Sequence, residues 1–280
     1  RSRGLGDVYK RQAIDVPSLT MNQQSLVEAL YKNLWYNPFP KVKHTERPDT
    51  TASAILDGNI VILVDNAPSA LLLPTSIFDV LEEADDYYFP PVTGTYLKLA
   101  RYFITIVTVL ITPLWLLALQ NSDYCPEFFR FVLLDEPQNI PVFWQLILME
   151  VGIDGLRLAA LNTPNSLTTP LSIIGAIALS EFAVESGWVS MEAILYMALV
   201  TVANFTQPNF ELGYSFKFCR VLLLVLTYIF NVWGFIIAFI INLVLLCTNR
   251  TLSSKSYLYP LVPFNGKEFL RKILRIRNPR

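Results

Sequence analysis

Residues 171–184 read LSIIGAIALSEFAV, an apolar run that carries Glu181 in its interior. A second apolar run, ILYMALVTVA at residues 194–203, follows after a short break. Runs of this kind are typical of helices that lie in a membrane. A carboxylate at the centre of a lipid-facing helix costs about 2.5 kcal/mol or more. We therefore expect Glu181 to face protein, water or an opposite charge.

The composition of the 280-residue chain is also that of a membrane protein. Hydrophobic residues make up 53% of the chain and charged residues only 16%, which departs from the composition of ordinary soluble domains. The net charge of -1 gives no indication of nucleic-acid binding. Cys125, Cys219 and Cys247 lie far apart, and His44 is the only histidine. The sequence therefore predicts neither a disulfide framework nor a zinc site.

No motif in the chain is typical of an enzyme. There is no phosphate-binding loop, no dinucleotide glycine fingerprint and no zinc-binding pair of residues. The adjacent carboxylates Asp85 and Asp86 lie in an acidic segment, and we interpret them as a solvated face. We predict that the protein is not an enzyme and that it uses no metal or other cofactor.

The chain divides by sequence into four parts. Residues 1–12, RSRGLGDVYKRQ, are interpreted as non-native, adapter-like sequence, with the native N-terminus missing. Residues 13–95 are predicted to be part of a cytosolic α+β domain. Residues 96–249 form the predicted membrane domain, and residues 250–280 form a basic tail. The expected fold is a mainly α-helical polytopic membrane protein with about 5–6 membrane segments.

The α+β part shows short patterns of both kinds. Apolar residues at helical spacing favour a helix that ends before Asn37, because Pro38 and Pro40 cannot continue it. A second short helix is expected near Ala52–Leu56. Ile60–Val64 and Ala70–Leu73 are predicted to be strands joined by a turn. The acidic run Thr75–Tyr88 is predicted to be one helix.

The candidate membrane segments differ in length and polarity. Five are clear, and a sixth, at residues 140–161, would place both chain ends in the cytoplasm, which we favour. Several are shorter than the roughly 20 residues of a relaxed span, so re-entrant segments stay an alternative. By the positive-inside rule the basic tail is cytoplasmic, and the acidic loop at residues 120–139 is expected outside. The clear candidates are Tyr102–Leu119, Leu171–Gly187, Met191–Phe205, Phe218–Asn231 and Trp233–Cys247.

Charged residues within the apolar segments are the candidate pore or gating residues. Glu150, Asp154 and Arg157 share one helical stripe. The stripe is consistent with a pore-lining or subunit-facing helix, with an interfacial amphipathic helix, or with an Asp154–Arg157 pair that only lowers the cost of insertion. Glu181 and Glu185 lie one turn apart and, in a ring of identical subunits, would form circles of carboxylates suited to cations.

Polar and small residues give weaker indications. Asn204 and Asn242 are further pore or gating candidates, although such residues also tie helices together. Ser172, Ala176 and Ser180 repeat every four residues, a spacing that permits close helix packing.

Several motifs together resemble the GerA-type spore germination proteins, and they cover nearly the whole chain after Gln12. Glu150-Val151-Gly152 and Thr163-Pro164-Asn165 favour the stage V branch of the family over the A subunits of nutrient receptors. One departure lies at Ser180-Glu181, where family members often have Gly-Gln. The motifs are Lys41–Thr50, Ile55–Gly58, Ile60–Asp65 with Pro68, Asp86–Tyr88, Glu150–Gly152, Arg157, Thr163–Asn165, Tyr257–Pro260 and Pro263–Asn265.

The resemblance implies a subunit of the spore inner membrane that assembles as a homo-oligomeric ring and conducts monovalent cations during germination. It also implies other germination membrane proteins as partners. Two alternatives stay open at this point. One is a secondary transporter of a small solute or ion, and the other is a non-conducting membrane scaffold for other germination proteins.

Overall fold

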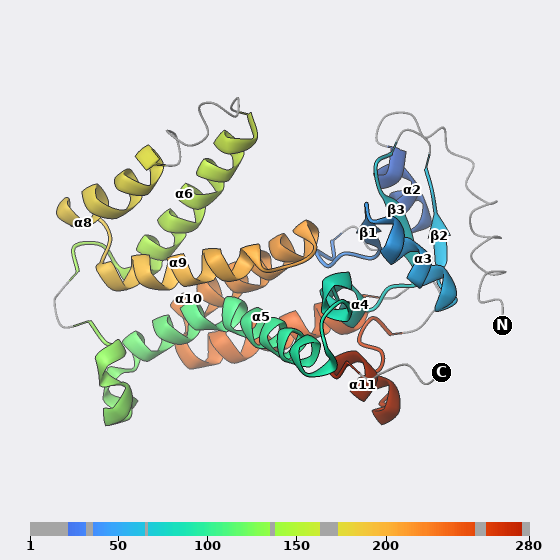
Figure 1. The fold of residues 1–280 in the computed structure, drawn as a ribbon. Helices are drawn as coiled ribbons and strands as arrows, with labels where there is room; N and C mark the ends of the chain where they lie inside the picture. The colour runs from blue at the N-terminus through green and yellow to red at the C-terminus, as the bar shows by residue number, and fades with distance from the viewer. Residues whose placement is uncertain are drawn as a thin grey trace. The chain divides into compact units, whose positions relative to one another are not determined.

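The computed structural model describes residues 22–31, 36–64, 67–134, 138–162, 173–249 and 256–275. It is mainly helical and contains one small sheet (Figure 1). The chain forms two compact units. The first comprises Arg1–Phe103, Gln207–Ser215 and Ile241–Arg280, and the second comprises Ile104–Thr206 and Phe216–Ile240. The predicted helical class is confirmed, whereas the predicted limits of the four sequence parts stay predictions.

The first unit contains a three-stranded sheet in the order β1 (Lys43–Thr45), β3 (Ala70–Leu73) and β2 (Ile60–Ile62). Both pairings are antiparallel. The β2–β3 pairing confirms the two predicted strands, although Asp65 and Asn66 of the expected turn lie outside the described residues. Strand β1 was not predicted, because its sequence KHT shows no apolar alternation.

The sheet is covered by short helices. α2 (Asn22–Leu30) confirms the first predicted helix, and α3 (Pro48–Leu56) begins four residues before the predicted Ala52. Proline favours the first helical turn, because its missing N–H would have no partner there. The buried core of the sheet comprises Val42, Ile62, Leu71 and Leu73, and it packs against Leu26, Val27, Leu30, Tyr31, Ile60 and Val64.

The segment predicted as one helix at Thr75–Tyr88 is two short elements, so that prediction is wrong. α4 (Ile77–Leu81) begins with a reciprocal cap between Ser76 and Asp79. The backbone is then extended at Glu82, and the 3₁₀ helix η1 (Ala84–Tyr87) follows. Long-range ion pairs of Glu82, described below, outweigh the local helical preference.

α5 (Pro91–Gln120) contains the predicted span Tyr102–Leu119 and begins well before it. Thr105, Thr108 and Thr112 are all buried. The Thr108 hydroxyl donates to the Ile104 carbonyl at 2.8 Å, which is the plain explanation for a threonine in an apolar helix. The Thr112 hydroxyl is buried without a hydrogen-bond partner in the described part of the chain.

The core of the second unit is formed by α5, α6 (Val142–Asn162), α9 (Met191–Phe205) and part of α10. α6 packs against α9. In the chain they are separated by the helical residues 173–185 (Figure 1), which include a π-helical turn at Ala178–Phe182. The buried cluster comprises Trp115, Leu116, Phe143, Leu146, Met149, Val189, Ala193, Met197 and Leu224.

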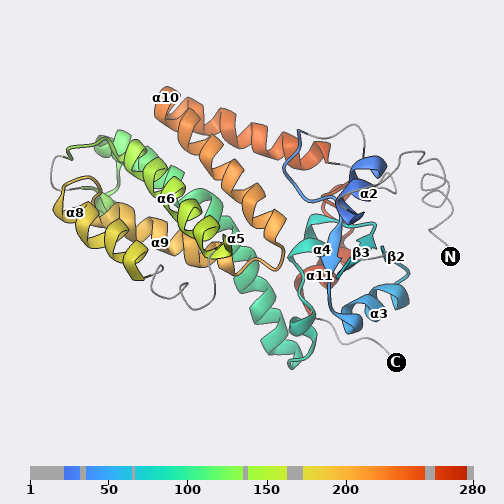
Figure 2. The same cartoon turned by 90° about the horizontal axis from the view of Figure 1, so that it is seen from above.

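α10 (Phe210–Thr248) is a helix broken at Asn231, whose φ is 54°. Its two limbs meet at an angle (Figure 2), so the predicted boundary between segments ending at Asn231 and beginning at Trp233 is confirmed. With ψ at −131°, Asn231 lies outside the left-handed helical region in which asparagine is enriched, so the break is a strained backbone position. A Cβ at Gly234 would collide with the Leu226 carbonyl, so glycine permits the limbs to approach closely. The Asn231 and Asn121 amides exchange hydrogen bonds of 2.5 and 3.1 Å.

Among the residues that the structure describes, two helices are long and apolar enough to cross a membrane, namely α5 and α10. α9 is a shorter apolar helix. These helices indicate membrane association, whereas the expected number of about 5–6 membrane segments stays a prediction.

Candidate functional site

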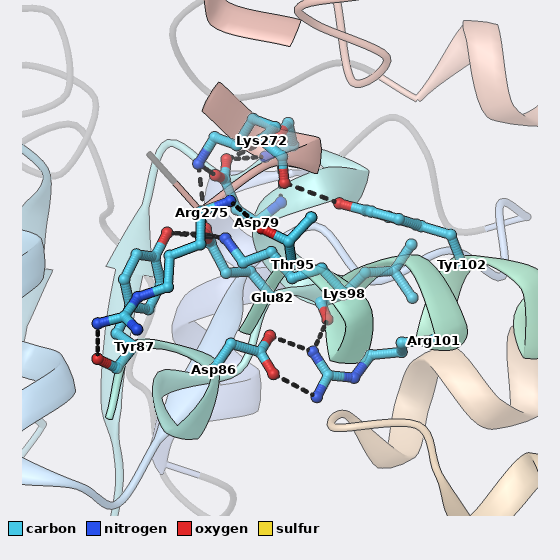
Figure 3. Close-up of polar contacts among 12 residues, drawn as sticks. Asp79, Glu82, Asp86, Tyr87, Thr95, Lys98, Arg101, Tyr102, Lys272 and Arg275 are labelled. Carbon is cyan, nitrogen blue, oxygen red and sulfur yellow. Dashed lines mark hydrogen bonds and ion pairs between the residues drawn. The ribbon is translucent and has the colours of Figure 1, made fainter. Parts of the chain in front are cut away.

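A polar network joins the residues after α4 to the first turns of α5 (Figure 3). Glu82 is at its centre: its carboxylate lies 2.7 Å from Lys98 Nζ and 3.2 Å from Lys272 Nζ, and it accepts a hydrogen bond from the Tyr87 hydroxyl. The Lys98 side chain is only 2% exposed. A buried cation is costly unless it is paired, so the Lys98–Glu82 pair fixes this part of the chain against α5.

A second buried pair reinforces the same junction. Arg101 donates from both terminal nitrogens to the Asp86 carboxylate at 2.6 and 3.0 Å, and it also donates to the Leu81 carbonyl at 3.2 Å. Asp86 is 1% exposed. The interpretation of Asp85 and Asp86 as one solvated face is therefore wrong for Asp86, because tertiary contact supplies an arginine that the local sequence does not contain. Asp85 is exposed and pairs with Arg47 at 2.5 Å.

The C-terminal helix α11 (Gly266–Ile273) is attached to this network. Lys272 pairs with Asp79 as well as with Glu82, and its carbonyl accepts a hydrogen bond from the Tyr102 hydroxyl at 3.4 Å. The backbone N–H of Arg275 donates to Thr95 Oγ1 at 3.1 Å (Figure 3). The network is thus a joint between the end of the sheet region, the start of α5 and the tail.

Burial and charge act on the joint in opposite directions. Burial alone would raise the pKa of Glu82, but Lys272 and Lys98 outweigh it and lower the pKa to about 2. Burial alone would lower the pKa of Lys272, but Asp79 and Glu82 outweigh it and raise the pKa. Burial lowers the pKa of Lys43, whose Nζ donates to the Asp79 and Glu82 carbonyls at 2.7 and 2.6 Å.

A pocket of about 480 Å³ lies beside the joint and is lined in part by Lys43, Asp79, Glu82 and Lys272. Asp79, Glu82 and Lys272 of its wall are already paired with one another, so the arrangement is suited to holding three segments together rather than to acid–base catalysis. Over the described ranges of the chain, no three His, Cys, Asp or Glu side chains gather into a set that could hold a metal ion.

The second unit contains a separate ion cluster between α6 and α10. Glu150 is 4% exposed, and its carboxylate lies 2.7 Å from Arg220 Nε and 3.2 Å from Lys217 Nζ. Lys217 also pairs with Asp154. Arg220 Nη1 donates to the Thr108 carbonyl at 3.1 Å, which connects the cluster to α5.

Glu150 and Asp154, two of the three stripe residues predicted on α6, therefore belong to one cluster, and their cationic partners were not predicted. Asp154 pairs with Lys217 rather than with Arg157. The Arg157 guanidinium instead lies over the Phe205 ring, 5.1 Å from its centre. Lys217 and Arg220 were missed, although they stand three residues apart on one face of an otherwise apolar run. That spacing was the available signal.

Glu181 and Glu185 lie apart from both clusters. Both are exposed, and Glu181 lies in the π-helical turn, an irregularity often found at functional sites. Neither carboxylate forms an ion pair with any residue that the structure describes. The role of Glu181 and Glu185 as pore or gating residues stays a prediction.

The remaining predicted residues are dispersed. Asn204 is partly buried, and its Oδ1 has no hydrogen-bond partner within the described segments. Asn242 is 7% exposed. Of the predicted packing residues, Ala176 is exposed, whereas Ser172 and the side chain of Ser180 lie outside what the structure describes. Gly175 makes the closer contact in this segment, since a Cβ there would collide with Leu156.

Comparison with known proteins decides the family. A family model described as Bacillus/Clostridium GerA spore germination protein matches residues 7–280. The chain belongs to the GerA family. The resemblance predicted from its motifs is thereby confirmed.

The relatives of this GerA chain include the branch that its motifs favoured. Stage V sporulation protein AF of Bacillus subtilis is 36% identical over 267 residues, which cover 95% of this chain and 54% of the relative. The uncharacterized membrane protein YfkQ and spore germination protein A1, both of Bacillus subtilis, are each 28% identical over 88% and 89% of this chain. They are covered over 48% and 52% of their own lengths. The chain thus spans about half the length of these relatives. No solved structure matches it.

Several residues that carry the GerA resemblance turn out to form contacts of the two clusters. Lys43 and Asp86 belong to the joint, and Glu150 is the centre of the α6–α10 cluster. Tyr257 is 1% exposed and its carbonyl accepts the Ile77 N–H at 3.0 Å. Thr163–Asn165 lie outside the described residues. The motifs of the family are thus, at these positions, structural supports.

Proposed function

We propose that this GerA-family chain is a subunit of a homo-oligomeric ring in the spore inner membrane, and that the ring conducts monovalent cations outward during germination. The family assignment supports a role in spore germination or sporulation. The two long apolar helices, and the naming of one relative as a membrane protein, support a place in the bilayer. Other germination membrane proteins are the proposed partners of the ring.

The ends of α5 and α10 that belong to the first unit support an even number of membrane crossings. The first turns of α5 and both ends of α10 belong to the unit that contains the sheet. If that unit lies on the cytoplasmic side with the basic tail, α5 crosses once and the two limbs of α10 cross out and back. An odd number of crossings must then lie between them, which favours the predicted arrangement of about six segments over one of about five.

The observation that carries the proposal is the contrast between the acidic residues of the helices. Glu150 and Asp154 are neutralised within the chain by Arg220 and Lys217. Glu181 is exposed in an apolar helix, and in the part of the chain that the structure describes it has no cationic partner. A lipid-facing carboxylate costs about 2.5 kcal/mol or more. A water-filled passage between subunits would remove that cost and supply a weak cation site.

Recordings from the protein in planar bilayers test the proposal. We expect single-channel steps that favour cations, and we expect Glu181→Gln to lower the ratio of cation to anion permeability. Glu127→Gln is the matched control, since Glu127 is an exposed carboxylate in the 3₁₀ helix η3 (Glu127–Val132) that follows α5, where the same change should leave selectivity unaltered.

Other outcomes distinguish the alternatives. Saturable flux without single-channel steps would show that the protein is a secondary transporter. Absence of any flux would favour the non-conducting scaffold. Channel activity with the same selectivity in Glu181→Gln would keep the channel but remove Glu181 from its lining.

A further inference from the structure

The tail carries an exposed face that is both apolar and basic. Phe264 is 71% exposed and Leu270 is 51% exposed. Lys267 and Arg271 are also exposed and lie on the same side of α11 as Leu270, since residues three and four apart share a helical face. We name this surface the tail face and define it by Leu261, Val262, Phe264, Lys267, Leu270 and Arg271, all of which are exposed.

The charges around the tail face are predominantly positive. Glu268 is the acidic residue of α11, and it lies 3.8 Å from Arg271, which is itself 64% exposed. Lys272 points the other way, toward Asp79 and Glu82 of the joint. The helix therefore presents Lys272 to the protein, and it presents Lys267, Arg271 and the partly exposed Glu268 to its surroundings, with one net positive charge.

The attachment of α11 fixes where the tail face lies along α5. Lys272 of α11 contacts Tyr102, and Arg275, just beyond the helix, contacts Thr95 (Figure 3). Thr95 and Tyr102 share one face of α5. A neighbouring face of α5 carries a row of exposed apolar residues at spacings of four, three and four. Val92, Tyr96, Leu99 and Phe103 in that row are 83%, 68%, 47% and 68% exposed.

Phe103 is the member of this row that lies within the predicted span Tyr102–Leu119, so in the proposed crossing the row leads along α5 to the point where the helix enters the bilayer. Tyrosine is enriched where a helix passes through the headgroup layer. Because Lys272 of α11 contacts α5 at Tyr102, the tail face would lie near the level at which α5 enters the bilayer in the proposed crossing.

We propose that the tail face binds anionic lipid headgroups of the cytoplasmic leaflet. Its apolar residues would lie at the boundary of the acyl chains, and Lys267 and Arg271 would reach the negatively charged headgroups, as in amphipathic helices that lie in a membrane interface. The inference rests on the proposed crossing of α5. The complementarity of two exposed cations with an anionic leaflet, next to a helix that enters it, is the reason for choosing lipid over a protein partner.

A depth measurement on the full chain tests the tail face. The three cysteines would be replaced by serine and a single cysteine placed at residue 270, labelled with an environment-sensitive fluorophore, and reconstituted in vesicles of phosphatidylcholine with or without phosphatidylglycerol. Quenching by lipids that carry a spin label near the headgroup reports contact with the bilayer. Phe103→Cys, on α5, is the positive control, and Leu56→Cys, which is 88% exposed on α3, is the negative control.

We expect the label at residue 270 to be quenched in vesicles that contain phosphatidylglycerol. Each basic residue near an anionic surface contributes about a fivefold factor to association. Lys267→Gln with Arg271→Gln should therefore lower the equilibrium constant for contact roughly 30-fold, and high salt should act in the same direction.

The controls separate the possible failures. If the label at residue 103 is quenched and the label at residue 270 is not, the tail face does not bind lipid and the inference is overturned. Absence of quenching at both positions would overturn the crossing of α5 as well. If the quenching at residue 270 is equal with and without phosphatidylglycerol and is unchanged by the double substitution, the tail face does not recognise anionic headgroups. If neither the spin-labelled lipid nor a water-soluble quencher quenches the label at residue 270, the tail face is covered by protein rather than by lipid, and the inference is overturned.

The unmodified chain provides a second measurement that does not depend on cysteine replacement. Trypsin cleaves after Lys267 and Arg271, so headgroup binding should slow these cleavages in vesicles that contain phosphatidylglycerol. Cleavage at equal rates with and without the anionic lipid would contradict the inference.

Discussion

The substitution Arg220→Met removes the arginine that lies against Glu150 and leaves the other contacts of the cluster in place. Glu150 would keep Lys217 at 3.2 Å but would lose Arg220 Nε at 2.7 Å. At an effective dielectric constant of about 20 these two attractions are worth about 5 and 6 kcal/mol before desolvation. The Thr108 carbonyl would also lose its donor.

The expected loss of stability is about 3–5 kcal/mol, because the buried Glu150 carboxylate loses the nearer of its two partners and keeps its desolvation cost. For a chain of this length that corresponds to a fall in melting temperature of roughly 6–10 °C. Replacing both groups, as in Glu150→Leu with Arg220→Met, should cost much less than Arg220→Met alone, since no buried charge then lacks a partner.

Thermal unfolding in detergent, followed by tryptophan fluorescence, measures both effects, because Trp115 belongs to the same unit and is 2% exposed. Phe218→Leu is the control on the same helix, since Phe218 is 60% exposed and contributes little to packing. A loss below about 1 kcal/mol for Arg220→Met, or a double variant no more stable than the single one, would refute the view that this ion pair holds α6 against α10.

Three further predictions concern the joint and the break in α10. The pKa of Glu82 falls from 4.5 to about 2 in the folded state. Its ion pairs therefore add about 3 kcal/mol to the free energy of unfolding at pH values above the unfolded-state pKa. The stability difference between the wild type and Glu82→Gln should shrink as the pH falls from about 4.5 to 2, and a difference independent of pH in denaturant titrations would contradict this. Gly94→Ala should destabilise the joint by about 1–3 kcal/mol and speed trypsin cleavage of the tail, because the new Cβ would lie 2.7 Å from Arg275 Cδ and still closer to the Asp86 carbonyl; unchanged cleavage would show that the contact is relieved without cost. Asn231→Ala should cost about 1–3 kcal/mol in thermal unfolding through the lost bonds to Asn121. Asn231→Gly loses the same bonds but should cost less, because glycine adopts this positive φ without strain; equal losses in the two variants would show that the break stores no strain.

Elements whose cause is local were predictable from the sequence. The limits of α9 and the break at Asn231 follow from apolar length and from residues that end helices. The β2–β3 pair follows from two short apolar runs around a turn. Where the sequence-based assignment failed, as at Thr75–Tyr88, the competing contacts come from residues far along the chain. Glu82 leaves the helical conformation while paired with Lys98 and Lys272, which its neighbours in sequence cannot reveal.

The candidate site divides in the same way. Its acidic residues in apolar helices could be found by inspection, because a charge in such a run is conspicuous at any position. Their partners could not, because an ion pair between α6 and α10 depends on which faces meet, and a single sequence fixes the faces of a helix but not its neighbours. By itself, the sequence determined the mainly helical class, the family and the candidate carboxylates. Only the tertiary structure decided that Glu150 is neutralised by Arg220 while the described chain leaves Glu181 exposed, since desolvation and pairing are properties of the packed helices.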